Sequence, residues 1–165
     1  MGIPAQIAHM ILEEHKHKPI KGDLLLCGRQ AMHMKVDQAK DFVKQRGVNV
    51  REGVEPRVDV HTREAKGNGW ISDDSFFSLF TDARFNAVDV TDYEQANIIH
   101  NMCTPIEAKL HKRFDFIYNG SCMDNLANPG AFLVNTLRML RPGGVVIHLE
   151  HGSLWPGAYL MYSPD

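Results

Sequence analysis

The residue types that could bind a ligand or move a proton lie directly after short apolar segments of this chain. Glycine lets a backbone approach a ligand closely, carboxylates and amides make hydrogen bonds, and histidine moves protons near neutral pH. If each apolar segment is a strand, these residues sit at the carboxyl ends of the strands. The residues concerned are Gly28, Arg29, Asp89, His100, Asn101, Asn119, Gly120, His148, Glu150 and His151.

Apolar segments expected to be strands alternate with helical patterns. The strands are expected over residues 24–27, 85–90, 97–102, 114–120 and 145–151, and the helices over 5–17, 38–46, 73–83 and 128–141. This alternation predicts an α/β fold with a Rossmann-like, doubly wound, mostly parallel sheet that carries helices on both faces. Because parallel strands end at one edge of a sheet, we expect the polar residues to meet there, near the switch point in strand order.

The length of 165 residues predicts a single domain over residues 1–165. An N-terminal helix is expected within residues 1–20. Residues 47–72 are charged and carry glycine and proline, so they are expected to form an irregular insertion or lid, with a short edge strand over 54–60. The apolar residues expected to face the core are Ile7, Met10 and Ile11 in the first helix and Phe132, Leu133, Leu137 and Leu140 in the last.

Composition excludes several classes of partner. The formal net charge is −2 and no long block has one sign, so neither nucleic acid nor an anionic membrane is expected to bind. No apolar run has the length of a membrane span, and the first residues do not form a signal peptide. The cysteines are widely spaced without a CxxC motif, which is typical of a reduced, cytoplasmic protein without a metal site.

The most specific pattern lies in residues 114–152. The segment FDFIYNGSCMDNLANPGAFLVNTLRMLRPGGVVIHLEHG resembles the fourth strand, the following helix and the fifth strand of class I methyltransferases that use S-adenosylmethionine (SAM). FNAVDV resembles the second strand of that family and IIHNMCTPI the third, so the resemblance covers residues 20–152. More narrowly, the GRQ loop, DVTDYEQANIIHNM and the closing YSPD resemble a bacterial subset that replaces the glycine-rich loop. Some members of that subset accompany cell-surface polysaccharide genes.

The resemblance implies SAM as the cofactor and assigns contacts residue by residue. Gly28 corresponds to the first glycine of the family's loop, and Asp89 corresponds to the acid that binds the ribose hydroxyls. Asn101 takes the position that contacts adenine. Asn119 and Gly120 take the strand end beside the methyl group.

Each candidate also has a plainer interpretation. Gly28 fits a tight turn, and Asp89 fits a cap of the turn that follows it. The guanidinium of Arg29 can hold the methionine carboxylate in place of the missing glycines, or it can pair with a nearby acid at the surface. His100 and His151 are candidate general bases, and the alternative for each is a buried histidine bonded to backbone.

The sequence departs from the family in three places. The second and third loop glycines are missing, residues 28–84 separate the first two strands, and the usual final pair of antiparallel strands is lacking. The chain is therefore either a minimal domain or part of a longer protein.

The sequence is compatible with two functions. One is SAM-dependent transfer of a methyl group to a hydroxyl or carboxyl oxygen of a small molecule or sugar, achieved mainly by positioning the reactants. The other is a catalytically inactive binding or scaffold module. A dinucleotide oxidoreductase is disfavoured because GxGxxG is absent. Trp155, Tyr159 and Tyr162 fit either the walls of a pocket or an interface, and together with an uncovered sheet edge they predict a homodimer.

Overall fold

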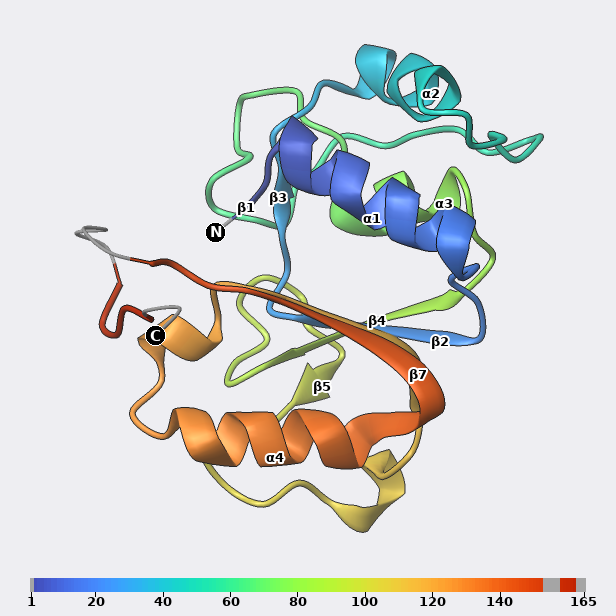
Figure 1. Ribbon diagram of the computed structural model, residues 1–165. Helices are drawn as coiled ribbons and strands as arrows, with labels where there is room; N and C mark the ends of the chain where they lie inside the picture. The colour runs from blue at the N-terminus through green and yellow to red at the C-terminus, as the bar shows by residue number, and fades with distance from the viewer. Residues whose placement is uncertain (1, 153–157, 163–165) are drawn as a thin grey trace. The chain divides into compact units, whose positions relative to one another are not determined.

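The main feature of the computed structural model is a five-stranded parallel sheet (Figure 1). The structure describes residues 2–152 and 158–162. The strands follow the order β5-β4-β2-β6-β7. Their bounds are β2 (Asp23–Cys27), β4 (Arg84–Asp89), β5 (Ile98–Ile99), β6 (Phe114–Gly120) and β7 (Leu140–Leu149). The α/β class and the parallel sheet are thus confirmed, and the strand order is compatible with a Rossmann-like fold.

The two central strands are buried because their sequences are apolar on both faces. Every residue of β2 is buried, and so is every residue of β6 except Asp115. A strand covered on both faces reads as a continuous apolar run, which is why residues 24–27 and 114–120 could be assigned from sequence. The pairing of Leu24 with Phe116 and of Cys27 with Asn119 fixes the register of these strands.

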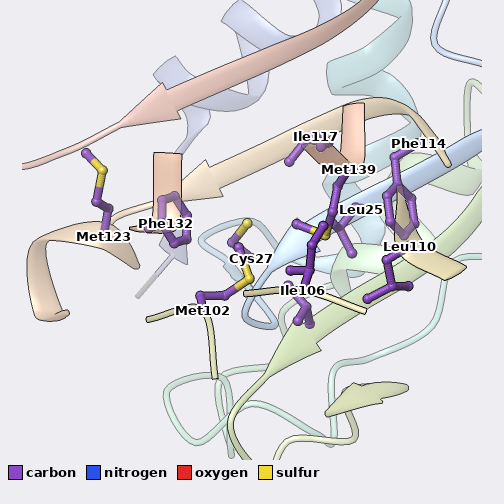
Figure 2. Close-up of a cluster of buried hydrophobic side chains, with 11 residues drawn as sticks. Leu25, Cys27, Met102, Ile106, Leu110, Phe114, Ile117, Met123, Phe132 and Met139 are labelled. Atoms are coloured by element: carbon purple, nitrogen blue, oxygen red, sulfur yellow. The ribbon is translucent and has the colours of Figure 1, made fainter. Parts of the chain in front are cut away.

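One face of the sheet packs against α4 (Pro129–Met139) through a cluster of buried apolar side chains (Figure 2). Asn128 caps the helix by accepting a hydrogen bond from the backbone amide of Ala131 at 3.0 Å. The predicted core face of this helix is partly wrong. Phe132 is buried, but Leu133 and Leu137 are 41% and 65% exposed. The buried residues of α4 are Phe132, Asn135, Thr136 and Met139.

The LRPGG segment departs from its expected role as a break between helix and strand. β7 begins at Leu140, directly after α4, and its pairing with β6 jumps from Phe114–Leu140 to Phe116–Val145. The bulge is compatible with glycine alone at two positions. Gly143 has a φ of 79°, and a Cβ on Gly144 would lie 2.8 Å from a Leu140 side-chain atom.

Short helices and one small parallel sheet form a second group of elements. β1 (Gly2–Ile3) pairs with β3 (Ala31–Met32). The helices are α1 (Ala5–His17), α2 (Val36–Gln45) and α3 (Asp73–Ser78). The first two are close to the predicted ranges, whereas α3 ends five residues before its predicted end at residue 83. In α1 the buried residues are Ala8, Ile11 and Leu12, whereas Met10, expected in the core, is 40% exposed.

Residues 47–72 are irregular, as predicted. They carry two isolated bridges, Val58 with Ile71 and Trp70 with Lys35, so the edge strand expected over 54–60 is wrong. The segment is nevertheless packed, because Asp59, Thr62 and Ala65 are buried. Its assignment as a lid stays a prediction.

The chain divides into two compact units. Residues 1–22 and 29–85 form one, and residues 23–28 and 86–165 form the other. The prediction of a single domain stays a prediction. The remaining elements are the 3-10 turns η1 (Ala108–Leu110) and η2 (Met123–Asn125). Within the described residues, no strand follows Leu149 and no helix has the length and apolar character needed to cross a membrane.

Candidate functional site

The carboxyl ends of the five strands lie side by side in register. Cys27 pairs with Asn119, and Asn119 pairs with His148. On the other side of β2, Asp89 pairs with Ile99. All predicted site residues except Arg29 belong to the unit that contains these strand ends. They are Gly28, Asp89, His100, Asn101, Asn119, Gly120 and His151.

Gly28 turns the chain immediately after the central strand. Its φ is 75°, a conformation that favours glycine, and its amide donates to the Val88 carbonyl at 2.8 Å. Asp89 follows Val88, and its side chain is half-buried. One carboxylate oxygen of Asp89 accepts from the Val90 amide at 2.6 Å. Gly28 and Asp89 therefore follow the neighbouring strands β2 and β4, and the strand order reverses between β2 and β6.

His100 and Asn101 continue from the short edge strand β5 into a turn. The His100 amide donates to the Asp89 carbonyl at 2.8 Å, so it extends the pairing with β4. Its Nε2 lies 3.1 Å from the Thr104 carbonyl, and that oxygen can only accept, so Nε2 carries the proton. The Asn101 side-chain oxygen accepts from the Cys103 amide at 2.9 Å. Both side chains thus help to hold the turn.

Asn119 is fully buried and organises the end of β6. Its amide nitrogen donates to Glu150 and, at 3.2 Å, to His148 Nδ1, while its oxygen accepts from the Cys122 amide at 2.9 Å. Glu150 in turn accepts from the Asp124 amide at 3.1 Å. Burial raises the pKa of Glu150, and the neighbouring charge of Asp124 adds to the rise. Both polar atoms of the Asn119 side chain are therefore hydrogen-bonded within the protein.

His151 binds a buried acid of the 3-10 turn η2. Its Nδ1 lies 2.5 Å from an oxygen of the fully buried Asp124 and 2.8 Å from the Ser121 hydroxyl. The carboxylate accepts the Nδ1 proton, so in the neutral ring the basic lone pair lies on Nε2. Ser121 has a φ of 58°, an uncommon conformation for a residue with a side chain. Asp124 and His151 are 27 residues apart, and no local pattern signals their contact.

Arg29 lies in the other unit and binds Asp73. Its Nε and Nη2 donate to the Asp73 carboxylate at 2.9 Å and 2.5 Å. The Asp73 carboxylate also accepts from the Gln30 amide at 2.8 Å. This is the acid pairing that the sequence left open, but both side chains are buried rather than at the surface.

The thiols near the strand ends lie in an acidic, buried setting. Burial raises the pKa of Cys122 to about 12, and the charges of Asp89, Glu150 and Asp124 add to the rise. Burial also raises the pKa of Cys27. None of these groups forms a metal cluster: within the described part of the chain, no three histidine, cysteine or acidic side chains are placed to hold an ion.

The residues predicted to form a dimer interface are only partly described. Tyr159 is 73% exposed, and the Tyr162 hydroxyl donates to the Met123 carbonyl at 3.4 Å. Trp155 lies outside the described residues. The homodimer stays a prediction.

Comparison of the chain with protein-family models, curated proteins and solved structures gave no match. Function must therefore be argued from the site itself.

Proposed function

We propose that the protein binds SAM at the carboxyl edge of its sheet and transfers a methyl group to a hydroxyl or carboxyl oxygen of a small molecule or sugar. The observation that carries the proposal is the position of Gly28 and Asp89. They follow the adjacent strands β2 and β4, and Gly28 lies beside the point between β2 and β6 where the strand order reverses, which is where open parallel sheets bind nucleotide-like ligands.

The residues at these strand ends fit the adenosine half of SAM. The Asp89 carboxylate is half-exposed and held by the Val90 amide, so it is oriented to accept hydrogen bonds from two ribose hydroxyls. Gly28 has no side chain to obstruct a close approach to the turn. Asn101 offers its amide nitrogen on the next strand end. Asn119 would support this surface through its hydrogen bond to Glu150, and Gly120 through its pairing with Leu149 of β7.

His151 is the better candidate for a general base. SAM, when bound, supplies an electrophilic methyl group. An acceptor hydroxyl must lose a proton, and Nε2 of His151 can take it because Asp124 fixes the other ring nitrogen as the proton donor. His100 is less suited, because its Nε2 already donates to the Thr104 carbonyl.

One observation favours the second candidate, a binding module without turnover. The guanidinium that the sequence offered for the methionine carboxylate is bound to Asp73. The proposed site then lacks an assigned cation for the amino-acid half of the cofactor.

Calorimetric titration with S-adenosylhomocysteine tests the binding step, with NAD as the control ligand. We expect binding by the wild-type chain and a loss of about tenfold or more in Asp89→Ala, because a charged acceptor of two hydrogen bonds disappears. Asp92→Ala is the matched control and should bind like the wild type, since Asp92 is exposed three residues further along. Equal binding by both variants would contradict the proposed site.

Turnover separates the two candidates. The chain is incubated with SAM that carries a labelled methyl group, together with a panel of sugars and carboxylic acids. Labelled product that disappears in His151→Ala supports the enzyme. Ligand binding without any labelled product supports the binding module.

A further inference from the structure

A second surface lies at the opposite ends of the strands from the proposed cofactor site. It is a cleft of about 400 Å³ where α4 ends and where β6 and β7 begin. Its lining residues are His111, Lys112, Leu137, Arg138, Leu140, Arg141, Pro142 and Gly143. The proposed methyl transfer uses none of them.

The walls of this cleft are fixed by backbone hydrogen bonds. The Lys112 amide donates to the Arg138 carbonyl at 2.7 Å, and the Arg113 amide donates to the Met139 carbonyl at 2.9 Å. Arg141 binds the Asp115 carboxylate at 2.6 Å and 2.7 Å, which ties the bulge of β7 to β6. The cleft is therefore formed before any ligand arrives, which lowers the entropic cost of binding.

The rim of the cleft carries an excess of positive charge. Lys112, Arg138 and Arg141 surround it, and no acidic residue is among its lining residues. Arg141 has Asp115 as its counter-ion. Lys112 and Arg138 are exposed, and no acidic side chain in the described part of the chain pairs with either of them.

The lining between these cations is apolar, and it continues along the outer face of α4. Leu137 is 65% exposed at the cleft, and Leu133 and Val134 are 41% and 46% exposed on the preceding turn of the helix. Residues three and four apart share one face of a helix, so these three side chains form a continuous apolar stripe. A helix that is apolar on both its inner and its outer face is usually covered on both.

We propose that this cleft and stripe dock an acidic amphipathic segment of a partner protein. Its aliphatic side chains would lie on Leu133, Val134 and Leu137, and its carboxylates would pair with Lys112 and Arg138. Charge and apolar surface together select this occupant. A phosphate or a nucleic acid would satisfy the cations but leave the leucines exposed. A second copy related by two-fold symmetry would place two copies of this basic patch in one interface, and the repulsion between them costs free energy.

Fluorescence anisotropy with labelled synthetic helical peptides tests this proposal on the full chain. The probe repeats leucine every three and four positions and carries glutamate elsewhere. One comparison peptide has lysine for every glutamate, and another has serine for every leucine. We expect saturable binding of the probe only, which weakens as salt is raised. Equal binding of the lysine peptide or of the serine peptide would overturn the proposal.

Matched variants locate the peptide on the surface. Lys112→Glu with Arg138→Glu should weaken binding of the probe at least tenfold, and so should Leu137→Ser. Lys44→Glu with Lys66→Glu changes the net charge equally at exposed sites in the other unit and should leave binding unchanged. Circular dichroism checks that each variant is folded, and Leu137→Ser alone is sufficient if the charge variant is not. Unchanged affinity in folded cleft variants would overturn the proposal.

Sedimentation velocity tests whether a second copy of the chain covers this surface. A wild-type chain that stays monomeric, or a dimer that survives Leu137→Ser, agrees with a cleft open to a partner. A dimer that Leu137→Ser dissociates would show that a second copy covers the surface, and it would overturn the proposal.

Discussion

At the scale of single residues, the three cysteines lie in different surroundings. Cys27 is 1% exposed, and burial raises its pKa. Burial raises the pKa of Cys122 to about 12, so its thiol stays protonated at pH 8. Cys103 is partly buried, like Cys122, and lies on the turn that follows β5. Because the thiolate is the reactive form, the three residues should differ sharply in alkylation.

We predict that iodoacetamide at pH 8 modifies Cys103 first, while Cys27 and Cys122 stay unmodified until the chain unfolds. Peptide mass spectrometry after timed quenching measures each site. Modification of all three at one rate in denaturant is the control. Native modification of Cys122 as fast as that of Cys103 would contradict its buried environment.

At the scale of elements, Asn135 connects α4 to the turn after β5. Its side chain is 1% exposed and donates to the carbonyls of Met102 and Thr104 at 3.0 Å and 2.7 Å. Its oxygen accepts from the Ile106 amide at 3.3 Å. One amide therefore satisfies three backbone groups of the segment that positions Asn101.

We predict that Asn135→Ala lowers the free energy of unfolding by about 3 kcal/mol, because buried backbone groups lose their partners. Leu137→Ala, two residues away on the exposed side of the same helix, should change it by less than about 0.5 kcal/mol. Urea denaturation followed by circular dichroism measures both. Equal losses of free energy of unfolding in the two variants would mean that the hydrogen bonds of Asn135 do not stabilise the fold as proposed.

The local sequence pattern predicted which segments form helices and strands better than it predicted which side of each is buried. β2 and β6 were predictable because strands buried on both sides are apolar throughout. The core face of α4 was not, because leucine and valine also occupy its outer side. Strand ends follow from parallel pairing, so the grouping of Gly28 with Asp89 was predictable. The pairs His151–Asp124 and Arg29–Asp73 join residues 27 and 44 positions apart, and only the folded chain reveals them.

At the scale of the whole molecule, the path of the chain links the two units repeatedly. Along the sequence, strand β2 separates two segments of the other unit. Strand β4 begins in one unit and ends in the other. A chain that crosses three times between two units cannot release one of them by fraying at a single terminus. We therefore expect the units to unfold together, in agreement with the predicted single domain.

The Arg29–Asp73 pair provides the perturbation that tests this expectation, because it lies wholly within one unit. Asp73→Ala removes the main counter-ion of the buried Arg29 guanidinium and leaves Asp74, whose carboxylate lies 3.4 Å from Nη2, so this should cost about 3 kcal/mol. In a Trp155→Phe background, tryptophan fluorescence reports Trp70, which lies in the same unit as the pair. Circular dichroism reports both units.

If the units unfold together, Asp73→Ala shifts both urea transitions by the same amount. Replacing both partners, Arg29→Met with Asp73→Leu, should recover part of the loss because no buried charge is left unpaired. A fluorescence transition that moves to lower urea while the circular dichroism signal divides into two steps would show that the units are separate domains.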